Sequence, residues 1–574
     1  MQKNFHFKSS TFISDGLIIL FLGALIFGIS SFGHQWDSSY NPNYQIDLSY
    51  VSLPKYAAYS ALRGFVAYLI SLLFTLLVGY WAASSARAEK IILPFLDVMQ
   101  SIPVLGFLPG LVLGLVSLFP KTNIGLEMAA ILMIFSGQVW NMTFAFYASL
   151  KSVPMDLKEA GQVMKLSAYE RLKFLELPFS AMTLTWNSVM SMAGGWFFLT
   201  VCEAFTLGNQ TYRLPGLGAY MAVAIEAGAT GPILAGILAM FAVILFFDLL
   251  LWRPALVWAH GYRLEEGESQ KMEEPFIQLI VRRSLFIRFL RKFYHSHRNL
   301  QIQTTEYLVA TSKKNFRFDF KISPLVKSTF NWTLGLVALV FITYGSWQLL
   351  RTFANVNLQT WSEILRDTFF TFLRVVMALL IGTLWAMPAA IWIAQSPKRL
   401  QWAQPLIQLL ASFPAPMLYP LALGLFIYLK INFEVSSMLL MLLGVQWYIL
   451  FNVLAGALRI PTELRLSMKL MRSSTWDQWR FLFLPSVLPA LVTGWVTAAG
   501  GAWNASIVSE LIVYRGSELK AHGLGAQISQ AAAAGDFSRL AVCLFVMILF
   551  VVLLNRTFWV KLHRLTQLRY RMDL

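Results

Sequence analysis

Long apolar runs, separated by short polar segments that carry most of the charges, recur along the whole chain. A helix needs about 20 mainly apolar residues to cross the hydrocarbon core of a bilayer. The pattern therefore predicts an all-α polytopic membrane protein with about 12 transmembrane helices. The predicted spans are approximately 16–32, 56–83, 94–119, 124–150, 178–207, 232–258, 324–350, 365–394, 405–429, 433–458, 485–513 and 537–560.

The composition agrees with this class. Of the 574 residues, 57% are hydrophobic and 13% are charged, whereas soluble proteins carry roughly 25% charged residues. The net charge of +17 is typical of nucleic-acid binders too, but Lys and Arg collect in loops on alternate sides of the apolar runs. No basic soluble domain with interleaved aromatic residues is present to hold a nucleic acid. We therefore expect the chain to contact membrane lipid and to bind no nucleic acid.

The distribution of basic residues also predicts the topology. Residues 151–176, 459–482 and 561–571 are rich in Lys and Arg, and the positive-inside rule places them in the cytoplasm with both chain termini. The first apolar run lacks a small-residue cleavage site, so we expect an uncleaved anchor rather than a secretory signal. The segments 33–55 and 208–231 are then external.

The second half of the chain repeats the first. Pro485 aligns with Pro178 at an offset of 307 residues, and a further block, 405–414, resembles 94–103 at an offset of 311. A change of loop length between the two blocks accounts for the difference. The pairs that share the offset of 307 include Pro154/Pro461, Pro178/Pro485, Gly194/Gly501, Trp196/Trp503, Glu203/Glu510, Gly216/Gly523 and Gly218/Gly525.

The duplication predicts three parts. Residues 1–259 form a first six-helix half, 260–323 a cytoplasmic basic linker, and 324–574 a second six-helix half. Within the linker, residues 275–297 have the pattern of a basic amphipathic helix on the inner leaflet, with a partner-docking helix as the alternative. Two parallel copies imply an axis along the membrane normal and a pathway between the halves.

The charged stretch 151–178 has the pattern of a short cytoplasmic helix. Pro154 and Asp156 favour a helix start. Ala160 and Gly161 remove bulk from one turn, so another protein's surface could approach the backbone. Pro178 interrupts the hydrogen-bond ladder where the chain returns to the membrane. The segment is thus either a socket for a partner protein or a solvated connector.

These residues resemble the EAA loop of ABC importer permeases, the binding-protein-dependent transport family. The resemblance covers about 57–258 and 365–560, and it implies a type I ABC importer permease fold. It further implies two P-loop ATP-binding subunits that seat on this coupling helix, a substrate-binding protein on the outer face, and location in a bacterial inner membrane. The residues that match in the first loop are Glu159, Ala160, Gly161, Leu175, Leu177 and Pro178.

Two departures from the family pattern concern the coupling contact. The usual glycine a few residues after E-A-A is Lys165 in the first loop and Arg472 in the second. In the second loop, 459–485, Leu466, Ser467 and Met468 replace Glu-Ala-Gly, which implies a weaker or different second contact. The resemblance assigns ATPase coupling to Glu159, Ala160, Gly161, Lys165, Pro178, Ser467, Met468, Arg472 and Pro485.

The pattern G-G-W, then Glu, then G-L-G resembles the nitrate/sulfonate/taurine branch of these permeases. Glu203 lies about 37 Å along a helix from Pro178, near the outer face. We expect such a glutamate either to shape a gate or contact a binding protein, or to be paired and hold the external loop. The prolines either line the pathway or kink helices for packing. The pathway and gate candidates are Pro103, Pro414, Trp196, Trp503, Glu203, Glu510, Gly216, Gly218, Gly523 and Gly525.

The chain carries no Walker-type phosphate loop and no metal-spaced His/Cys set, so we expect no catalytic residues, metal or cofactor. The predicted function is a permease subunit for a small anion of the nitrate, sulfonate, taurine or bicarbonate type, with ATP hydrolysis on separate partners. Fused permeases for iron or thiamine remain open. The rivals are a secondary transporter with parallel repeats, which needs ionisable residues near mid-helix, and a membrane scaffold.

Overall fold

The computed structural model describes residues 28–262 and 343–570, apart from Ile102 and Asn209, together with residues 333, 336 and 340. The chain divides into two compact units. One comprises 1–27 and 268–356, of which the described residues are mainly helical. The other comprises 28–267 and 357–574 and contains every element discussed below. The predicted basic linker lies outside the described residues from residue 263 onward, as do most of the predicted spans 16–32 and 324–350.

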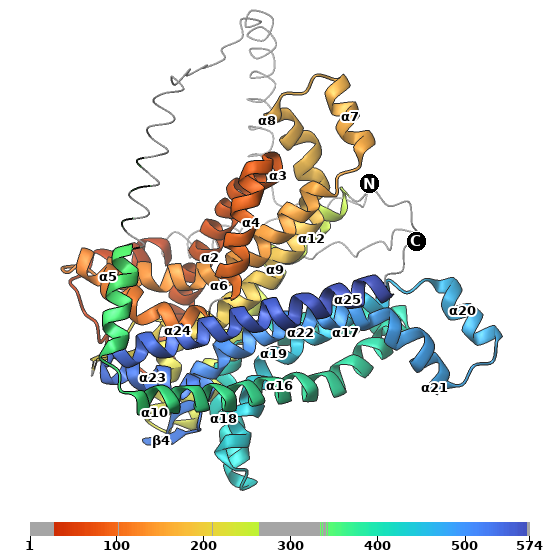
Figure 1. Cartoon of the computed structure of the whole chain (residues 1–574). Coiled ribbons are helices and arrows are strands. Elements are labelled where there is room, and N and C mark those ends of the chain that lie inside the picture. Colours follow the sequence, from red (N-terminus) through yellow and green to blue (C-terminus); the bar gives the residue numbers. More distant parts are fainter. Residues whose placement is uncertain are drawn as a thin grey trace, which may run out of the picture. The chain divides into compact units, whose positions relative to one another are not determined.

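The first half is helical, with one β-hairpin (Figure 1). Its helices, in which η denotes π- or 3₁₀-helical turns, are α2 Leu53–Phe74, η1 Thr75–Gly79, α3 Tyr80–Ser84, α4 Ala86–Ser101, η2 Val104–Phe107, α5 Leu108–Leu118, α6 Ile124–Lys151, α7 Met155–Val163, α8 Ala168–Arg171, η3 Leu172–Glu176, α9 Leu177–Cys202, α10 Leu217–Glu226, α11 Thr230–Phe247, η4 Asp248–Trp252 and α12 Arg253–His260. The hairpin strands are β1 Ala204–Leu207 and β2 Gln210–Arg213.

The second half repeats this order of elements. Its helices are α16 Leu358–Ala394, α17 Pro397–Ser412, α18 Ala415–Tyr428, α19 Phe433–Leu458, α20 Thr462–Leu470, α21 Thr475–Asp477, η5 Gln478–Phe483, α22 Leu484–Ser509, α23 Leu524–Ala534, α24 Phe537–Leu554, η6 Asn555–Trp559 and α25 Val560–Tyr570. Its hairpin strands are β3 Leu511–Tyr514 and β4 Ser517–Lys520.

The prediction of an all-α polytopic membrane protein in two repeats is confirmed. Among the described residues, 7 helices are long and apolar enough to cross a membrane, or 8 if the bent pair α17–α18 is one span. The predicted continuous helices 94–119 and 405–429 are wrong, because each is two helices separated at a proline. Pro103 and Pro414 both have extended backbone, and α17 and α18 meet at 88°. Proline lacks the N–H that would continue the helix.

The predicted helices 178–207 and 485–513 end earlier than expected, at Cys202 and Ser509. The chain then forms the two β-hairpins, in which β1 pairs with β2 and β3 with β4. Their residues are rich in β-branched and aromatic side chains, which favour strands. The tight turn of the second hairpin has positive φ at both central residues, 50° at Arg515 and 76° at Gly516, as a two-residue hairpin turn requires.

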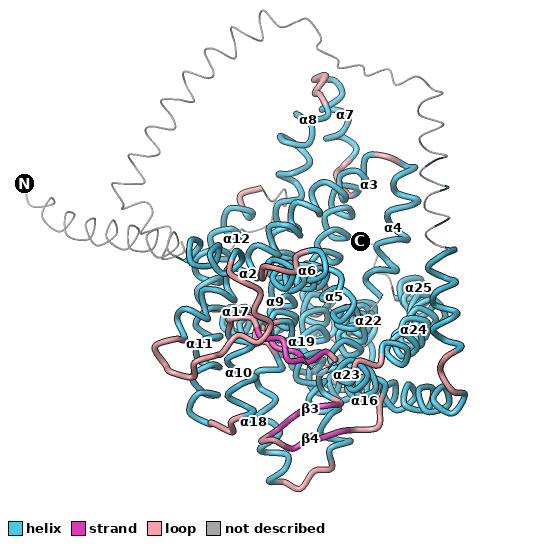
Figure 2. Tube along the Cα trace, turned by 90° about the vertical axis from the view of Figure 1, so that its left-hand side faces the viewer, coloured by secondary structure: helices cyan, strands magenta, loops and turns pink. Residues whose placement is uncertain are grey.

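Helices α2, α6 and α9 pack together in the first half, and α16, α19 and α22 pack together in the second. Small residues allow the helices to approach one another. A Cβ on Gly64 would lie 3.1 Å from the ring of Trp196. The strands and the short helices α10 and α23 lie at the end of the bundle opposite the α7–α8 hairpin (Figure 2).

Candidate functional site

A buried ion cluster fixes the end of α9. The side chains of Glu203, Arg63 and Glu127 are all 0% exposed. The Arg63 guanidinium donates to both Glu127 oxygens, each at 2.8 Å, and also pairs with Glu203. Glu203 accepts two more hydrogen bonds, from the Ser60 hydroxyl at 2.7 Å and from the backbone N–H of Gly218 at 2.6 Å. The carboxylate therefore ties α2, α6 and the start of α10 to the end of α9.

The second half contains an equivalent cluster at the end of α22. Arg374 Nη1 donates to Glu510 at 2.8 Å and also pairs with Glu434. Glu510 accepts hydrogen bonds from the Thr371 hydroxyl and from the backbone N–H of Gly525, both at 2.8 Å. The two clusters differ in exposure, because the Glu434 side chain is 37% exposed whereas Glu127 is 0% exposed.

Sequence reasoning identified the two central glutamates but missed their partners. Arg63 and Arg374 are related by the offset of 311 that relates Pro103 to Pro414, and Glu127 and Glu434 are related by the offset of 307. Extending the internal alignment to charged residues inside predicted spans would have found them.

The predicted glycines allow the backbone to cover these carboxylates. A Cβ on Gly216 would collide with the Glu203 carboxylate, and a Cβ on Gly218 would lie 2.5 Å from the Thr200 carbonyl oxygen. Equivalent collisions would occur at Gly523 and Gly525, with Glu510 and with the backbone of Ser506. Both glutamates are fully buried. Each glutamate is thus a paired carboxylate that also holds, through the backbone N–H of Gly218 or Gly525, the start of the short helix after the β-hairpin.

The remaining pathway candidates lie in different surroundings. Trp196 and Trp503 are buried in helix packing, with their rings 5.4 Å from Phe247 and 5.6 Å from Phe550, respectively. Pro103 and Pro414 lie at the helix breaks described above. The break at Pro414 borders an internal cavity, because Phe413 and Ala415 both line that cavity.

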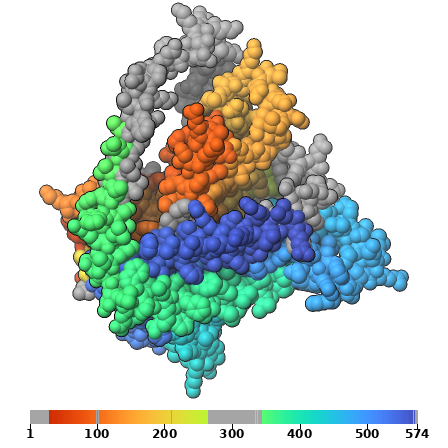
Figure 3. All heavy atoms as spheres, in the orientation of Figure 1, coloured from red at the N-terminus to blue at the C-terminus, as the bar shows by residue number. Residues whose placement is uncertain are grey.

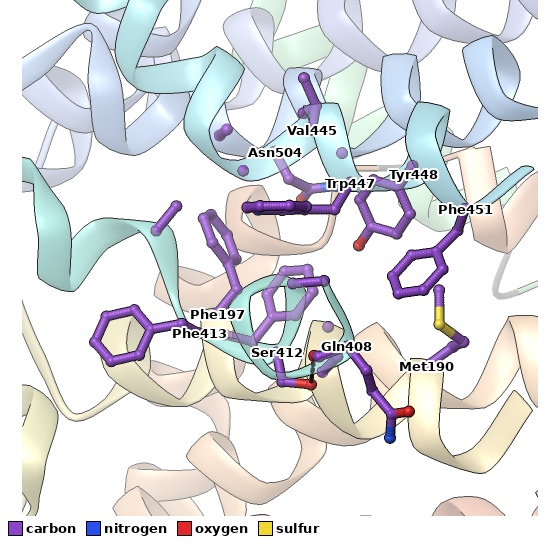
Figure 4. A pocket seen from close by; sticks show the side chains of 18 of the residues that line it. Met190, Phe197, Gln408, Ser412, Phe413, Val445, Trp447, Tyr448, Phe451 and Asn504 are labelled. Atoms are coloured by element: carbon purple, nitrogen blue, oxygen red, sulfur yellow. Dashed lines mark hydrogen bonds between the residues drawn. The ribbon is translucent and has the colours of Figure 1, made fainter. Parts of the chain in front are cut away.

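This central cavity has a volume of about 80 Å³ and lies between the halves. Its walls are formed by α9 of the first half and by α17, α18, α19 and α22 of the second. Water occupies about 30 Å³ per molecule, so the cavity has room for two or three waters or a small solute. None of the described residues that line it is charged. Aromatic rings and a few polar groups surround it (Figure 4).

Tyr448 is the polar group most clearly directed into the cavity (Figure 4). Its hydroxyl forms no hydrogen bond with any residue that the structure describes. The duplicated glycines Gly194 and Gly501 flank it, since their Cβ positions would lie 3.7 Å from its hydroxyl and 3.2 Å from its ring. Asn504 is nearby, and its Oδ1 accepts a hydrogen bond from the backbone N–H of Leu105 in the first half at 3.4 Å. The cavity thus offers hydrogen-bonding groups without a fixed charge.

The two charged segments form helical hairpins, α7–α8 and α20–α21, which project from the rest of the chain in separate places (Figure 3). In each hairpin a serine caps the second helix, Ser167 with Glu170 and Ser474 with Asp477. Hydrogen bonds from the Ser167 hydroxyl and backbone hold the pKa of Glu170 below its ordinary value. These reciprocal capping boxes fix the turn between the paired helices.

A glycine that lets a partner protein approach the backbone must lie on the exposed side of the hairpin, and Gly161 does not. Glu159 and Ala160 are exposed, but Gly161 is buried. A Cβ there would meet the side chains of Leu166 at 3.7 Å and Leu175 at 3.9 Å. The glycine therefore lets the two arms of the hairpin pack against each other. Pro178 and Pro485 lie in the first turns of α9 and α22.

Lys165 and Arg472 occupy left-handed backbone, with φ of 55° and 51°. Each follows the last turn of a helix that ends in a Schellman motif. In the first hairpin the Leu166 N–H donates to the Gly161 carbonyl at 3.0 Å, and in the second the Ser473 N–H donates to the Met468 carbonyl at 3.2 Å. Glycine is favoured in this conformation, so the two substitutions keep the backbone that a glycine would adopt.

Both hairpins expose large apolar side chains at equivalent positions. Large exposed apolar patches mark sites of protein or membrane interaction. Ser467 is the second-hairpin residue that replaces Ala160, yet the apolar positions around it are retained. The four exposed pairs, each at the offset of 307, are Val163/Leu470, Met164/Met471, Tyr169/Trp476 and Phe174/Phe481.

Metal binding finds no support among the described residues, because they contain no group of three His, Cys, Asp or Glu side chains that could hold an ion. The two cysteines, Cys202 and Cys543, are free and buried.

Comparison with known proteins identifies relatives of the chain. Over 213 residues, 33% of this chain and 75% of the relative, it is 22% identical to the nitrate import permease protein NrtB of Leptolyngbya laminosa. Over 165 residues, 29% of this chain and 55% of the relative, it is 28% identical to the taurine transport system permease protein TauC of Escherichia coli K12.

The family model for the binding-protein-dependent transport system inner membrane component matches twice, at residues 75–251 and 378–558. The two matches fall in the two repeats described above, and together they cover more than half of the chain. The chain is a multi-pass membrane protein that belongs to the family of binding-protein-dependent transport system inner membrane components.

Proposed function

We propose that this chain is the permease subunit of an ATP-driven importer, in which both halves are fused and each hairpin seats on one ATP-binding subunit. The observation that carries the proposal is the set of four exposed apolar pairs on the two hairpins. The second hairpin lacks the Glu-Ala-Gly residues of the first, but it keeps the helix ending, the cap and the exposed apolar surface. Two similar sockets would let two ATP-binding subunits act on both halves.

The proposed orientation places both hairpins and both termini in the cytoplasm of a bacterium, with the chain in the inner membrane. The hairpins and the C-terminal helix carry many Lys and Arg residues, as the positive-inside rule requires of cytoplasmic segments. Helix α9 has 26 residues and spans about 39 Å, so the β-hairpin that follows it would lie on the outer face. A substrate-binding protein would deliver the solute there.

The central cavity is the proposed narrow part of the pathway. Tyr448 and Asn504 would offer hydrogen bonds to a passing solute, while the absence of charge among the described lining residues would keep binding weak enough for release. The proposed solute is a small anion of the nitrate, sulfonate, taurine or bicarbonate type, and the two relatives support this class because they are named for nitrate and for taurine. The buried ionisable residues described above pair with one another, which gives a coupling-ion mechanism little support.

Substitutions on the exposed hairpin positions test this function. Met164→Asp and Met471→Asp each place a charge in one proposed socket without disturbing the buried contacts of the hairpin. We expect each to release at least half of the ATP-binding subunit that purifies with the chain, and the double variant to release nearly all of it. Gln162→Asp, which adds the same charge on an exposed polar position, is the matched control. Full retention in the double variant would contradict the proposal.

A further inference from the structure

Each β-hairpin reaches across to the other half of the molecule. At the turn of the first hairpin, the backbone N–H of Gly208 donates a hydrogen bond to the carbonyl of Ala532 at 3.0 Å. Ala532 lies in the last turn of α23, the short helix of the second half. Gly535, which follows that helix, lies against Gly208, because a Cβ on Gly535 would be 3.1 Å from the Gly208 Cα.

The duplication produces a reciprocal contact on the other side. Arg515, at the turn of the second hairpin, corresponds to Gly208, and Gly228, which follows α10, corresponds to Gly535. A Cβ on Gly228 would lie 3.7 Å from the Arg515 side chain. Gly208, Gly228 and Gly535 all have positive φ, between 57° and 70°. We call these two contacts the first and the second crossing. Each joins the turn of a β-hairpin to the glycine that follows the short helix, α23 or α10, of the other half.

The two crossings differ in tightness. The first has a backbone hydrogen bond between the halves, and no equivalent bond joins Arg515 to α10 among the described residues. Beside the second crossing lies an open cavity of about 260 Å³, whose lining includes Met221 of α10 and Tyr514 of β3. The first crossing is therefore the closer contact between the halves.

Both contacts lie at the end of the bundle that carries the β-hairpins (Figure 2), and the halves also touch further along, as in the hydrogen bond that the Gln408 amide donates to the Asp248 carboxylate at 3.2 Å. At the opposite end, the α7–α8 and α20–α21 hairpins lie well apart from each other (Figure 1). The central cavity lies between these two ends, bordered by residues from the middle of α9 and α19. The halves are therefore in contact beside the β-hairpins, while the two helical hairpins are separated from each other.

We propose that Gly208, Ala532 and Gly535 are gate residues, whose contact between the halves closes the pathway on the face of the β-hairpins and must separate for solute to enter. This inference rests on the proposed transport function. The contact consists of one hydrogen bond and close backbone packing, with no ion pair, so it can open without separating buried charges. The ion clusters at Glu203 and Glu510 hold each hairpin to its own half during that movement.

The first test establishes the contact by disulfide cross-linking of the full chain. Cysteines at two positions with neighbouring backbones meet the distance limits of a disulfide. We expect Gly208→Cys with Gly535→Cys to cross-link in most molecules under mild oxidation, detected by mass spectrometry of the linked peptides. The control pair is Gly516→Cys with Gly535→Cys, since Gly516 has no atom near its Cβ position. Equal yields in the two pairs would overturn the proposal.

The second test measures gating without any ATP-binding subunit. Gly535→Val forces a branched side chain against Gly208, whereas Gly228→Val has the same positive-φ cost and meets only the flexible Arg515 side chain. In vesicles containing the purified chain, we expect nitrate flux through Gly535→Val to exceed that through Gly228→Val at least fivefold. Both variants must elute as monodisperse protein. Equal flux through the two variants would overturn the gate. Failure to find an ATP-binding partner would instead overturn the proposed function, and it would leave the cross-linking and flux results unchanged.

Discussion

The buried ion cluster around Arg63 provides the sharpest prediction about stability. Replacement of Arg63 by Met keeps much of the side-chain volume but leaves Glu127 and Glu203, both 0% exposed, without a counter-charge. Removal of one partner from a buried ion pair typically costs about 3–5 kcal/mol. In the second half, Arg374→Met leaves Glu510 fully buried and Glu434 with 37% of its side chain exposed, so only one of the two carboxylates stays away from water. We expect Arg374→Met to cost roughly half as much as Arg63→Met.

The assay unfolds the two purified variants in the same detergent. The fraction of protein that remains monodisperse is the measured signal. A double variant, Arg63→Met with Glu203→Gln, isolates the cause because it removes one of the uncompensated charges. We expect it to be more stable than Arg63→Met alone, since neighbouring groups in one network do not add independently. If Arg63→Met is no more destabilising than Arg374→Met, or if Glu203→Gln fails to restore stability, the cluster does not hold α9 as described.

Four further substitutions, one of them with a matched control, follow from the geometry. Lys165→Gly and Arg472→Gly should each stabilise the chain by about 1 kcal/mol in the same unfolding assay, because left-handed backbone costs a residue with a Cβ about that much; destabilisation by either would contradict this account. Gly218→Ala should cost about 1–3 kcal/mol through overpacking against Thr200, whereas Gly110→Ala, which has open space at its Cβ, should be nearly neutral. Tyr448→Phe should leave unfolding unchanged and raise the KM for transported solute severalfold, and an unchanged KM would remove Tyr448 from the pathway.

The sequence predicts the repeat, the helical class and most span boundaries because these depend on long apolar runs and on a fixed internal offset. Residues 433–458 are a predicted span whose bounds agree with α19. The errors occur where a local feature interrupts an apolar run. Pro103 and Pro414 each divide one run into two helices, and the residues after Cys202 leave the helix for a strand while remaining apolar. Hydropathy alone does not separate these cases.

The candidate site is predictable to a lesser extent, because its parts meet only in three dimensions. Glu203 and Glu510 stand out as carboxylates at the end of apolar runs, but their arginine partners are 140 and 136 residues away in the chain. Tyr448 differs from its counterpart in the first half, which is Asn141. A comparison of the two halves that looks for identical residues therefore does not find it. The contact of Gly208 with Ala532 joins the two halves, so neither half alone indicates it.

If separate ATP-binding subunits drive this chain through both of its hairpins, they should purify with it. The most direct test is native mass spectrometry of the tagged chain, purified gently from its own membrane. We expect two P-loop ATP-binding domains per chain, one of which is lost from Met164→Asp and the other from Met471→Asp. A chain that purifies without any ATP-binding domain, and still moves solute when reconstituted alone, would contradict it.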